Sequence, residues 1–503
     1  MATLCLALHA NGSIQKQTIP RSMGQLKTSI STPLKIFLIF LKFISTVSVF
    51  GKSNEVWVEG EGMIHAVYFS KDPYGNWTVS YNNKYVDTET YRLEKQRNKP
   101  SLIPAVEGDP PAVLAALTLN LLRYGVANKY LSNTIVFEHS GKYNSVAENW
   151  IPQEIDIFTL KTLRDWDLNG TWRRPFTSRP KKAPGTGELV IMGADGKKPY
   201  YVVGVISGEV QDIYVFSIHY PSILKFVSFL PSADGKRLIH KADLKYNVIL
   251  DDPLVVDVGR VIKGGPLIKY EKNAFARIGV MPRFGDGDSV KWFEVEPNCT
   301  FHIINCFEDG HEVVVRGCKA QASIIPGPDL GLNKFQWFSQ GFMFHNSHHE
   351  NTSESAVGDG GLFTCVYEWR LNMETGEVKD RNLSGTELSM EFPMINNDYT
   401  GPKHKYGYTQ VIDPVASSTC GKPKYGSLAK LYFDEHGHDS TMPMKMEYHM
   451  LPPNNFFTGA TFVAKPASVE EEDEGWIMAF VHDENTKVVV VDAKKFEAEP
   501  TEN

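Results

Sequence analysis

The stretch 299–318 predicts a β-hairpin that carries a single histidine inside an apolar strand. Residues 299–307 are apolar or β-branched except for His302 and Asn305, and the Glu-Asp-Gly of 308–310 is typical of a tight turn between strands. A neutral imidazole in such a strand needs partners for both ring nitrogens. Metal binding at one nitrogen is a role that fits His302, and a hydrogen bond to a neighbouring carbonyl is the alternative.

Short alternating runs of apolar and polar residues recur along the chain, and Gly, Asn and Asp separate them. Residues 56–70 and 77–88 show this pattern, which is typical of short antiparallel strands. The clear exception is 110–130, where apolar residues recur at helical spacing behind a proline start. A chain of 503 residues with this pattern can form one large all-β unit.

Composition and charge narrow the class of protein. Apolar residues at 42% and charged residues at 22% are typical of a soluble globular protein with a sizeable core. A formal net charge of −7, with no basic stripe, argues against nucleic-acid binding. The six cysteines show no C-x-x-C spacing, so we expect reduced thiols rather than a disulfide framework; they stand at 5, 299, 306, 318, 365 and 420.

The first 54 residues are interpreted as a targeting or apolar N-terminal segment. No acidic residue precedes Glu55, while basic residues, serines and threonines are frequent, which resembles a plastid transit peptide. This favours a chloroplast location, with the cytoplasm as the alternative. Residues 33–50 are strongly apolar, but Lys35 and Lys42 interrupt them. We therefore expect an interfacial or substrate-tunnel helix with peripheral membrane contact, rather than a transmembrane helix or a secretory signal.

The string WFEVEPNCTFHIINCFEDGHEVVV (292–315) resembles the signature of the carotenoid cleavage oxygenases, and in particular of the plant carotenoid cleavage dioxygenases. The resemblance extends over residues 55–490. It implies an all-β fold, a seven-bladed β-propeller that is incomplete in places, with a few helices capping one face. Residues 55–503 would form this oxygenase domain. It also implies that His302 binds a non-haem Fe2+ on the propeller axis.

The same resemblance assigns three glutamates to the iron site. Glu148, Glu368 and Glu391 fall where the family places carboxylates that accept the second N–H of metal-binding imidazoles, which fixes the tautomer and strengthens the donor nitrogen. The family's chemistry needs no redox-active side chain. The protein supplies geometry, an apolar tunnel and exclusion of water.

The chain departs from the family at the segments that carry the other iron-binding histidines. Arg179, in TSRPKKAPGTGE, stands where the family has the histidine of T-x-H-P-K, and an arginine offers no lone pair to a metal. Residues 208–232 look like an insertion, and the histidine-bearing strand expected before Asn247 is missing. The chain also ends at Asn503, before the segment in which the family carries its last iron histidine.

The remaining histidines are not assigned to the metal. His219 and His240 lie outside the family's ligand motif, so we expect ordinary loop or strand-end residues. His345, His348 and His349 cluster in a polar loop, which can attract a divalent metal, but a solvated loop is the favoured interpretation.

Two hypotheses follow for function. The first is a dioxygenase that adds O2 across a conjugated C=C bond of an apolar carotenoid or apocarotenoid and gives two carbonyl products. On this view the departures reflect an imperfect gene model or a non-productive splice form of a working enzyme. The alternative is a degenerate, catalytically inactive propeller that binds apolar ligands or protein partners. A calcium- or zinc-dependent hydrolase is disfavoured, because no acidic cage accompanies the motif.

Overall fold

The computed structural model describes most of the strand-rich part of the chain. The described residues are 35–40, 47–48, 51–52, 61–103, 110–194, 201–218, 246–320, 364–435, 444–465 and 471–492, apart from 73, 75–76, 149, 173–174, 184–185, 209–212, 257–259, 261–262, 264–267, 272, 284, 386, 421–422 and 484–488. Five histidines discussed above lie outside the described residues: His219, His240, His345, His348 and His349.

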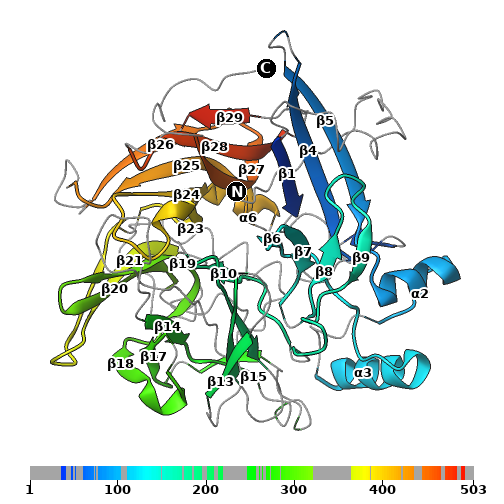
Figure 1. Ribbon diagram of the computed structural model, residues 1–503, viewed down its shortest axis with the longest axis horizontal. Helices are drawn as coiled ribbons and strands as arrows, with labels where there is room; N and C mark the ends of the chain where they lie inside the picture. Colours follow the sequence, from blue (N-terminus) through cyan, green and yellow to red (C-terminus); the bar gives the residue numbers. More distant parts are fainter. Residues whose placement is uncertain are drawn as a thin grey trace, which may run out of the picture.

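Five separate sheets of three or four antiparallel strands follow one another around the molecule (Figure 1). The first contains β1 (Lys35–Phe40), β4 (Met63–Lys71) and β5 (Trp77–Tyr85). The second contains β6 (Ile135–His139), β7 (Lys142–Val146), β8 (Gln153–Ile155) and β9 (Thr162–Asp165). The third contains β10 (Lys181–Lys182), β11 (Leu189–Ala194), β12 (Tyr201–Ile206) and β13 (Ile213–Ile218). The fourth contains β14 (Tyr246–Asp251), β17 (Ala276–Pro282) and β18 (Lys291–Val295), and the fifth contains β19 (Cys299–Asp309), β20 (Glu312–Ala320), β21 (Thr364–Asn372) and β22 (Val378–Asn382).

A wider sheet of seven strands follows in the sequence. Its strands are β23 (Met390–Met394), β24 (Tyr406–Ile412), β25 (Tyr425–Tyr432), β26 (Lys445–Met450), β27 (Asn455–Ala464), β28 (Gly475–Asp483) and β29 (Val489–Asp492). Two small sheets pair β2 (Val47–Ser48) with β3 (Gly51–Lys52), and β15 (Leu254–Val256) with β16 (Ile268–Tyr270).

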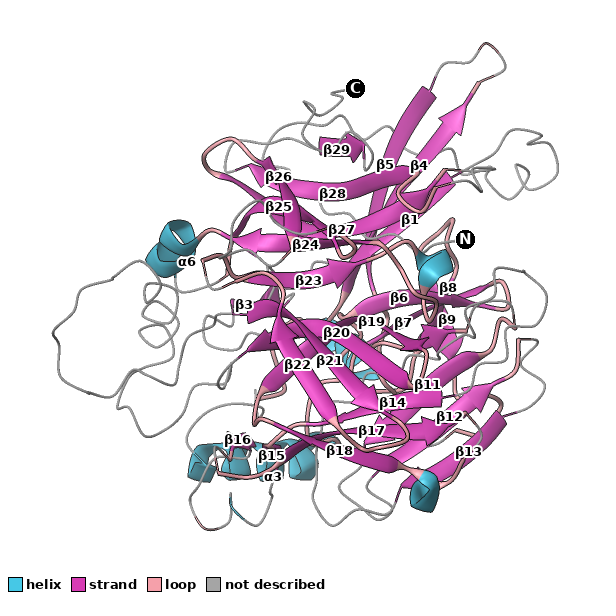
Figure 2. Cartoon of the chain, turned by 90° about the vertical axis from the view of Figure 1, so that its left-hand side faces the viewer, coloured by secondary structure: helices cyan, strands magenta, loops and turns pink. Residues whose placement is uncertain are grey.

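The described sheets form an all-β propeller, but the prediction of seven blades is wrong for this part of the chain. Five sheets are separate blades, and the last strands form one sheet. The physical reason is the pairing of β25 with β27 through Tyr425 and Phe457, which links the strands before and after it. Figure 2 shows β23, β24, β25 and β28 stacked over β20, β21 and β22, with β1, β4 and β5 beside them.

Helices are few among the described residues. The predicted helix at 110–130 is confirmed as α3 (Pro110–Tyr124). A second helix, α2 (Glu89–Arg97), was not predicted, although Thr88 caps it by accepting a hydrogen bond from the backbone N–H of Tyr91. The other helical elements are α6 (Pro414–Cys420) and the 3₁₀ turns η1 (Gly287–Ser289) and η4 (Asn397–Tyr399). None of the described helices is long and apolar enough to cross a membrane.

The helix predicted within 33–50 is wrong where that segment is described. Residues Lys35–Phe40 form β1, which pairs antiparallel with β4 from Lys35↔Phe69 to Phe40↔Ile64. The β-branched and aromatic residues of KIFLIF favour a strand, and pairing satisfies backbone groups at the edge of β4. This strand pair joins the two sides of the proposed boundary at residue 54.

The proposed insertion at 208–232 contains a regular blade strand. Ile213–Ile218 forms β13, which pairs along its full length with β12, from Tyr201↔Ile218 to Ile206↔Ile213. These six residues pair within the same sheet as β12, and the proposal that 208–232 is an insertion stays a prediction. The β-branched and aromatic residues of IYVFSI favour a strand.

The predicted hairpin at 299–318 is confirmed as β19 and β20. Gly310 adopts φ +65° at the turn, a conformation that side chains with a Cβ rarely adopt. The strand register shifts on both sides of His302, between Thr300 and His302 and again between Ile303 and Asn305. Such irregularities bend a strand and re-aim its side chains.

Candidate functional site

The centre of the candidate site is a hydrogen bond between His302 and Glu391. His302 lies on β19 opposite Cys318, and its Nδ1–H donates to the Oε2 of Glu391 on β23. The two residues are 8% and 9% exposed. A carboxylate that accepts from Nδ1 fixes the imidazole in the tautomer whose Nε2 carries the lone pair, which is the arrangement used by metal-binding and proton-accepting histidines.

Glu391 is positioned by an irregularity in its own strand. The register of β23 against β24 shifts after Glu391, and Phe392 takes φ +51°, an uncommon value for a residue with a side chain. The backbone N–H of Phe392 donates to the Oε2 of Glu391 at 2.8 Å. The Phe392 ring lies 4.8 Å from the His302 ring and 5.4 Å from the Tyr425 ring, measured between centroids. Backbone strain at this point therefore holds both the carboxylate and the aromatic wall of the imidazole.

The surroundings of Glu391 are desolvated. Burial, reinforced by the charge of Glu391, raises the pKa values of the Cys318 thiol and the Tyr425 hydroxyl. Both groups are therefore protonated at neutral pH. Cys299, Cys306, Cys318, Cys365 and Cys420 are free thiols, as expected from the sequence.

Glu148 lies beside the segment that carries Arg179. The backbone N–H and the hydroxyl of Ser178 both donate to Glu148 Oε2, at 2.8 and 2.5 Å. Burial raises the pKa of Glu148, while these hydrogen bonds and the charge of Arg179 act in the opposite direction. Glu148 therefore holds the chain at 178–179 through Ser178 and makes no hydrogen bond to His302.

Arg179 places a positive charge near both carboxylates. Burial lowers the pKa of Arg179, and the charges of Glu391 and Glu148 oppose that shift. Burial and the charge of Arg179 lower the pKa of Lys181 to about 8. A guanidinium stays protonated at neutral pH in spite of such a shift. Arg179 is therefore a permanent cation, and the charges of Glu391 and Glu148 act on it.

Glu368 has a different set of partners. It is fully buried and opposite Arg316 in the β20–β21 ladder, and its carboxylate accepts from Arg316 Nε at 2.8 Å and from Arg381 Nε at 3.0 Å. Arg370 approaches at 3.8 Å. Burial alone would raise the pKa of Glu368, but Arg316 and Arg381 hold it below its ordinary value. Of the three predicted glutamates, the structure brings Glu391 alone to the imidazole of His302.

The described residues do not fit an iron site by themselves. They contain no group of three or more His, Cys, Asp or Glu side chains placed to hold a metal ion. The donor set at the centre is the imidazole of His302 with the carboxylate of Glu391, and Arg179 stands nearby with N–H donors and no lone pair. One imidazole is too few ligands to select Fe2+ by number and geometry.

Sequence reasoning missed three residues that shape this centre: Ser178, Phe392 and Tyr425. Ser178 directly precedes Arg179 in the divergent motif, so the motif itself could have drawn attention to it. Phe392 follows Glu391 in EFPMIN, but no feature of the sequence indicates its positive φ. Tyr425 is 34 residues beyond Glu391 in the sequence, and only the fold brings it close.

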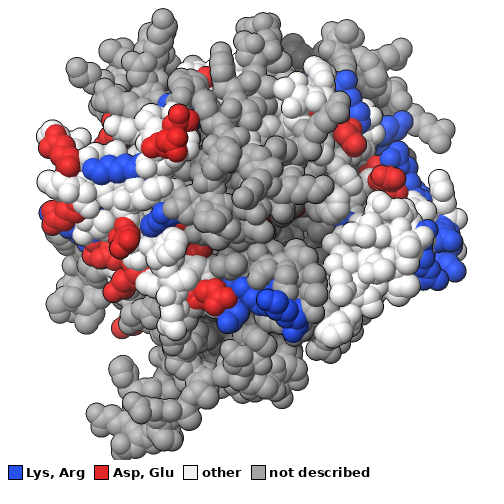
Figure 3. All heavy atoms as spheres, turned by 90° about the horizontal axis from the view of Figure 1, so that it is seen from below, with Lys and Arg blue, Asp and Glu red and all other residues white. Residues whose placement is uncertain are grey.

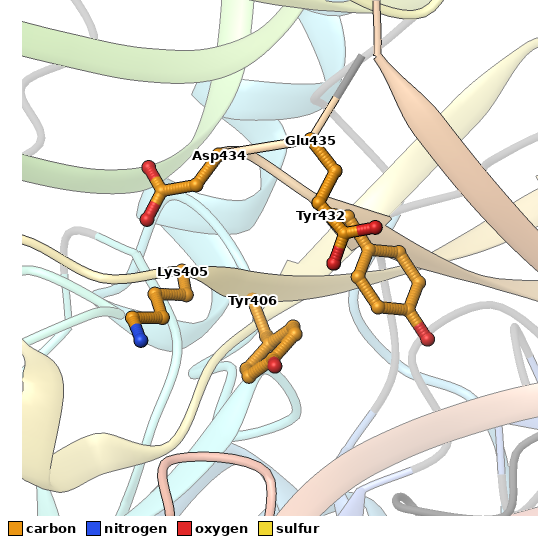
Figure 4. Close-up of a pocket in the computed structure, with 5 residues that line it drawn as sticks. All are labelled: Lys405, Tyr406, Tyr432, Asp434 and Glu435. Atoms are coloured by element: carbon orange, nitrogen blue, oxygen red, sulfur yellow. The ribbon is translucent and has the colours of Figure 1, made fainter. Parts of the chain in front are cut away.

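A small cleft lies elsewhere on the wide sheet. Figure 4 shows its lining, which consists of Lys405, Tyr406, Tyr432, Asp434 and Glu435, and its volume is about 160 Å³. This volume is below the roughly 300–1,000 Å³ of typical small-molecule sites. The lining contains none of the predicted site residues, so the cleft does not explain polyene binding.

Glu472 holds one wall of this cleft and predicts a pH dependence of stability. Its two carboxylate oxygens accept from the backbone N–H groups of Lys405 and Tyr406, at 2.8 and 2.9 Å, and it is 6% exposed. Burial raises the pKa of Glu472 from 4.5 to about 7. The folded chain then binds this proton more tightly than the unfolded chain, so stability falls as pH rises from 4.5 to 7 and levels off above 7.

We expect Glu472→Gln to remove this part of the pH dependence, which amounts to up to about 3 kcal/mol. The free energy of unfolding, measured by denaturant titration at pH 5 and pH 7.5, should change less with pH in the variant than in the wild type. The neighbouring exposed residue gives the control, Glu471→Gln. Equal pH dependence in all three proteins would contradict the expectation.

Comparisons with known proteins agree with this architecture. The model of a family described as retinal pigment epithelial membrane protein matches residues 42–501. The chain is 28% identical over 471 residues to carotenoid 9,10(9',10')-cleavage dioxygenase 1 of Pisum sativum, covering 88% of this chain and 77% of the relative. It is 25% identical over 458 residues to a 9-cis-epoxycarotenoid dioxygenase of Oryza sativa that is named chloroplastic, covering 87% and 63%.

Solved structures share the fold at lower identity. The lignostilbene dioxygenase of Pseudomonas brassicacearum superposes with a TM-score of 0.70 at 19% identity, covering 93% of this chain and 90% of that chain. A cobalt-substituted apocarotenoid oxygenase of Synechocystis gives a TM-score of 0.67 at 16% identity, covering 93% and 92%. At these identities the likeness concerns the fold.

Proposed function

Because the chain belongs to the carotenoid cleavage oxygenase family, whose model is described as retinal pigment epithelial membrane protein, we propose that it cleaves a conjugated C=C bond of an apolar polyene with O2. The products are two carbonyl compounds. The observation that carries the proposal is the buried hydrogen bond between His302 and Glu391, which lies in the hairpin that bears the family's signature.

Within this proposal each described residue has a limited role. Glu391 orients the imidazole of His302 and keeps its Nε2 lone pair available. The partly buried ring of Phe392 and the buried ring of Tyr425 pack on that side and limit its contact with water. Family membership supports Fe2+ as the cofactor. Among the described residues, His302 is the side chain that would bind it. The roles of Glu148 and Glu368 at the cofactor site stay predictions.

The relatives support an apolar conjugated substrate. Curated relatives are named for cleavage of carotenoids, and one structural neighbour is named for lignostilbene. We propose a carotenoid or apocarotenoid as the substrate of this chain. We propose a chloroplast location, with the cytoplasm as the alternative. The proposal rests on the basic composition of residues 1–54 and on the relatives named chloroplastic.

The experiment is a cleavage assay of the purified full chain supplied with Fe2+ and O2. Loss of polyene absorbance, followed by mass spectrometry of the products, is measured for a carotenoid, an apocarotenoid and a stilbene phenol. We expect cleavage of at least one member of this panel. The inactive-propeller alternative, which the relatives do not favour, predicts ligand binding without products, and binding that His302→Ala leaves unchanged.

An exposed apolar face of α3 supports peripheral membrane contact. Val113, Ala116 and Asn120 face the protein and are buried, so the leucines on the rest of the helix face outward. The exposed leucines are Leu114, Leu119, Leu121 and Leu122, and Leu122 is 79% exposed. In Figure 3 uncharged side chains gather at the position of α3, with Lys and Arg at the margin. An apolar helix face bordered by basic residues is typical of interfacial helices.

We expect Leu122→Asp to weaken binding to vesicles of phosphatidylcholine and phosphatidylglycerol by about 10-fold or more, because a leucine side chain no longer enters the lipid. Binding is measured by co-sedimentation. Val415→Asp is the matched control, since Val415 is 68% exposed on a different helix, α6. Equal binding of the two variants would show that α3 makes no lipid contact.

A further inference from the structure

The side chain of Asn305 fastens the segment 395–405, which leads from β23 to β24, to β19. Asn305 is fully buried, and its Nδ2 donates to the backbone carbonyls of Tyr399 and Pro402, at 2.8 and 2.9 Å. Its Oδ1 accepts from the backbone N–H of Gly401 at 2.9 Å. One amide therefore binds donors and acceptors of the same segment, as a neighbouring strand would.

A β-bulge in β19 turns Asn305 to the same face as His302. His302 pairs with Cys318, and Asn305 pairs with Arg316, so one residue of β19 between them has no partner on β20. Because Cys318 and Arg316 are two positions apart on β20, the residues opposite them share one face of the hairpin. Asn305 and Arg316 then both reach His404: Asn305 Nδ2 lies 3.0 Å from its Nδ1, and Arg316 Nη1 donates to its carbonyl oxygen at 3.4 Å.

The segment held by Asn305 directly follows the strand that carries Glu391. β19 and β23 belong to different sheets, and the two strands are in contact. The ladder of β23 with β24 is irregular after Glu391, where Phe392 takes a positive φ, so pairing with β24 constrains this part of β23 less. The hydrogen bond of His302 with Glu391 and those of Asn305 both join β19 to this part of the wide sheet.

The far side of the segment 395–405 is fixed by Glu472. The Glu472 carboxylate accepts from the backbone N–H groups of Lys405 and Tyr406, and its backbone carbonyl accepts from Asn396 Nδ2 at 3.0 Å. The segment is therefore held between Glu472 and β19, and Asn305 makes the contact on the β19 side.

We propose that Asn305 is a positioning residue for the His302–Glu391 pair. By holding the segment 395–405 against β19, it sets the separation of β19 and β23 where the carboxylate meets the imidazole. This separation matters because a hydrogen bond weakens steeply when its distance and angle leave the normal range. The inference rests on the proposed function only for the use that is made of the pair, and it does not depend on the metal or the substrate.

The test follows the Nδ1 proton of His302 by NMR in the purified full chain, labelled with ¹⁵N-histidine. A proton held between a buried imidazole and a carboxylate exchanges slowly with water, and its signal is identified by its absence from His302→Ala. In Asn305→Ala we expect this proton to exchange at least about 10-fold faster, because the Glu391 carboxylate is no longer held in place.

Asn120 on α3 gives a matched control, because its amide makes the same kind of contacts far from the pair in the sequence. It is fully buried, its Nδ2 donates to the carbonyls of Ile103 and Ala127, both at 2.8 Å, and its Oδ1 accepts from the N–H of Ile103 at 2.9 Å. Asn120→Ala should lower the melting temperature about as much as Asn305→Ala, and should leave the exchange of the His302 proton within about twofold of the wild type. Equally fast exchange in both variants would trace the effect to a general loss of stability and overturn the inference.

Unchanged exchange in a folded Asn305→Ala variant would also overturn it. If that variant does not fold, Gly401→Ala decides: Gly401 has φ +96°, which alanine adopts only with strain, so the substitution displaces the N–H that donates to Asn305 and leaves Asn305 itself intact. The exchange rate should then rise by about 3-fold or more, and a rate equal to that of the wild type would contradict the inference. Failure of the proposed cleavage reaction is a separate result, because none of these measurements uses a substrate.

Discussion

Replacing His302 by alanine is expected to lower cleavage activity, measured at saturating Fe2+, by more than about 100-fold while the chain stays folded. Nε2 of the His302 imidazole is the atom that the described residues offer as a metal ligand. In the alanine variant the neighbouring residues of β19 remain in place. Glu391→Gln should lower the same rate by about 10- to 100-fold, because the amide no longer fixes the tautomer of His302. Initial rates are measured by loss of polyene absorbance.

A second histidine–glutamate pair, between the β19–β20 turn and the β21–β22 turn, supplies the control. His311 Nδ1 lies 2.9 Å from Glu374 Oε1 at the surface, where both side chains are largely exposed. His311→Ala and Glu374→Gln should leave the rate within about twofold of the wild type, since exposed pairs of this kind contribute little. If both surface variants lost as much activity as the buried ones, the role given to His302 would be wrong.

Glu368→Ala is expected to destabilise the fold by about 3–5 kcal/mol, because it leaves the guanidinium of Arg316 buried without its carboxylate. Arg316 is 4% exposed and also packs over the rings of Phe307 and Phe433, at 4.9 and 4.1 Å from the ring centroids. Denaturant titration at neutral pH measures the free energy of unfolding. Since the arginines hold the pKa of Glu368 down, this contribution to stability is present at neutral pH and is lost on acidification.

Two variants show whether the effect belongs to the buried pair. Glu377→Ala removes an exposed carboxylate 3.7 Å from Lys379 and should cost less than about 0.5 kcal/mol. The double variant Glu368→Leu with Arg316→Met replaces the buried pair by apolar groups and should recover much of the loss. If Glu368→Ala instead lowered activity without changing stability, Glu368 would belong to the cofactor site.

The sequence predicted local elements well where periodicity and turn residues agreed. The hairpin β19–β20 and the helix α3 follow from apolar spacing, the Glu-Asp-Gly turn and a proline start. The family, identified from residues 292–315, is confirmed by the match over 42–501. The segment Lys35–Phe40 was misassigned because a short apolar run fits a helix or a strand equally, and its pairing with β4 decides between them.

The candidate site was predictable only in part. Glu391 lies 89 residues after His302 in the sequence. Its place at the site was therefore predicted from the family resemblance and not from residue spacing. The resemblance assigns Glu368 to the same site, and that role stays a prediction. Its pairing with Arg316 depends on the register of β20 against β21, which the sequence does not specify. The number of separate blades likewise depends on the Tyr425–Phe457 pairing, a contact between distant strands.

The most direct measurement of the central claim is the identity of the products formed when the full chain, saturated with Fe2+, meets a carotenoid under ¹⁸O2. The account predicts two carbonyl fragments that together make up the carbon skeleton of the substrate, each carrying an oxygen derived from O2. An intact substrate after prolonged incubation, with iron bound throughout, would contradict it.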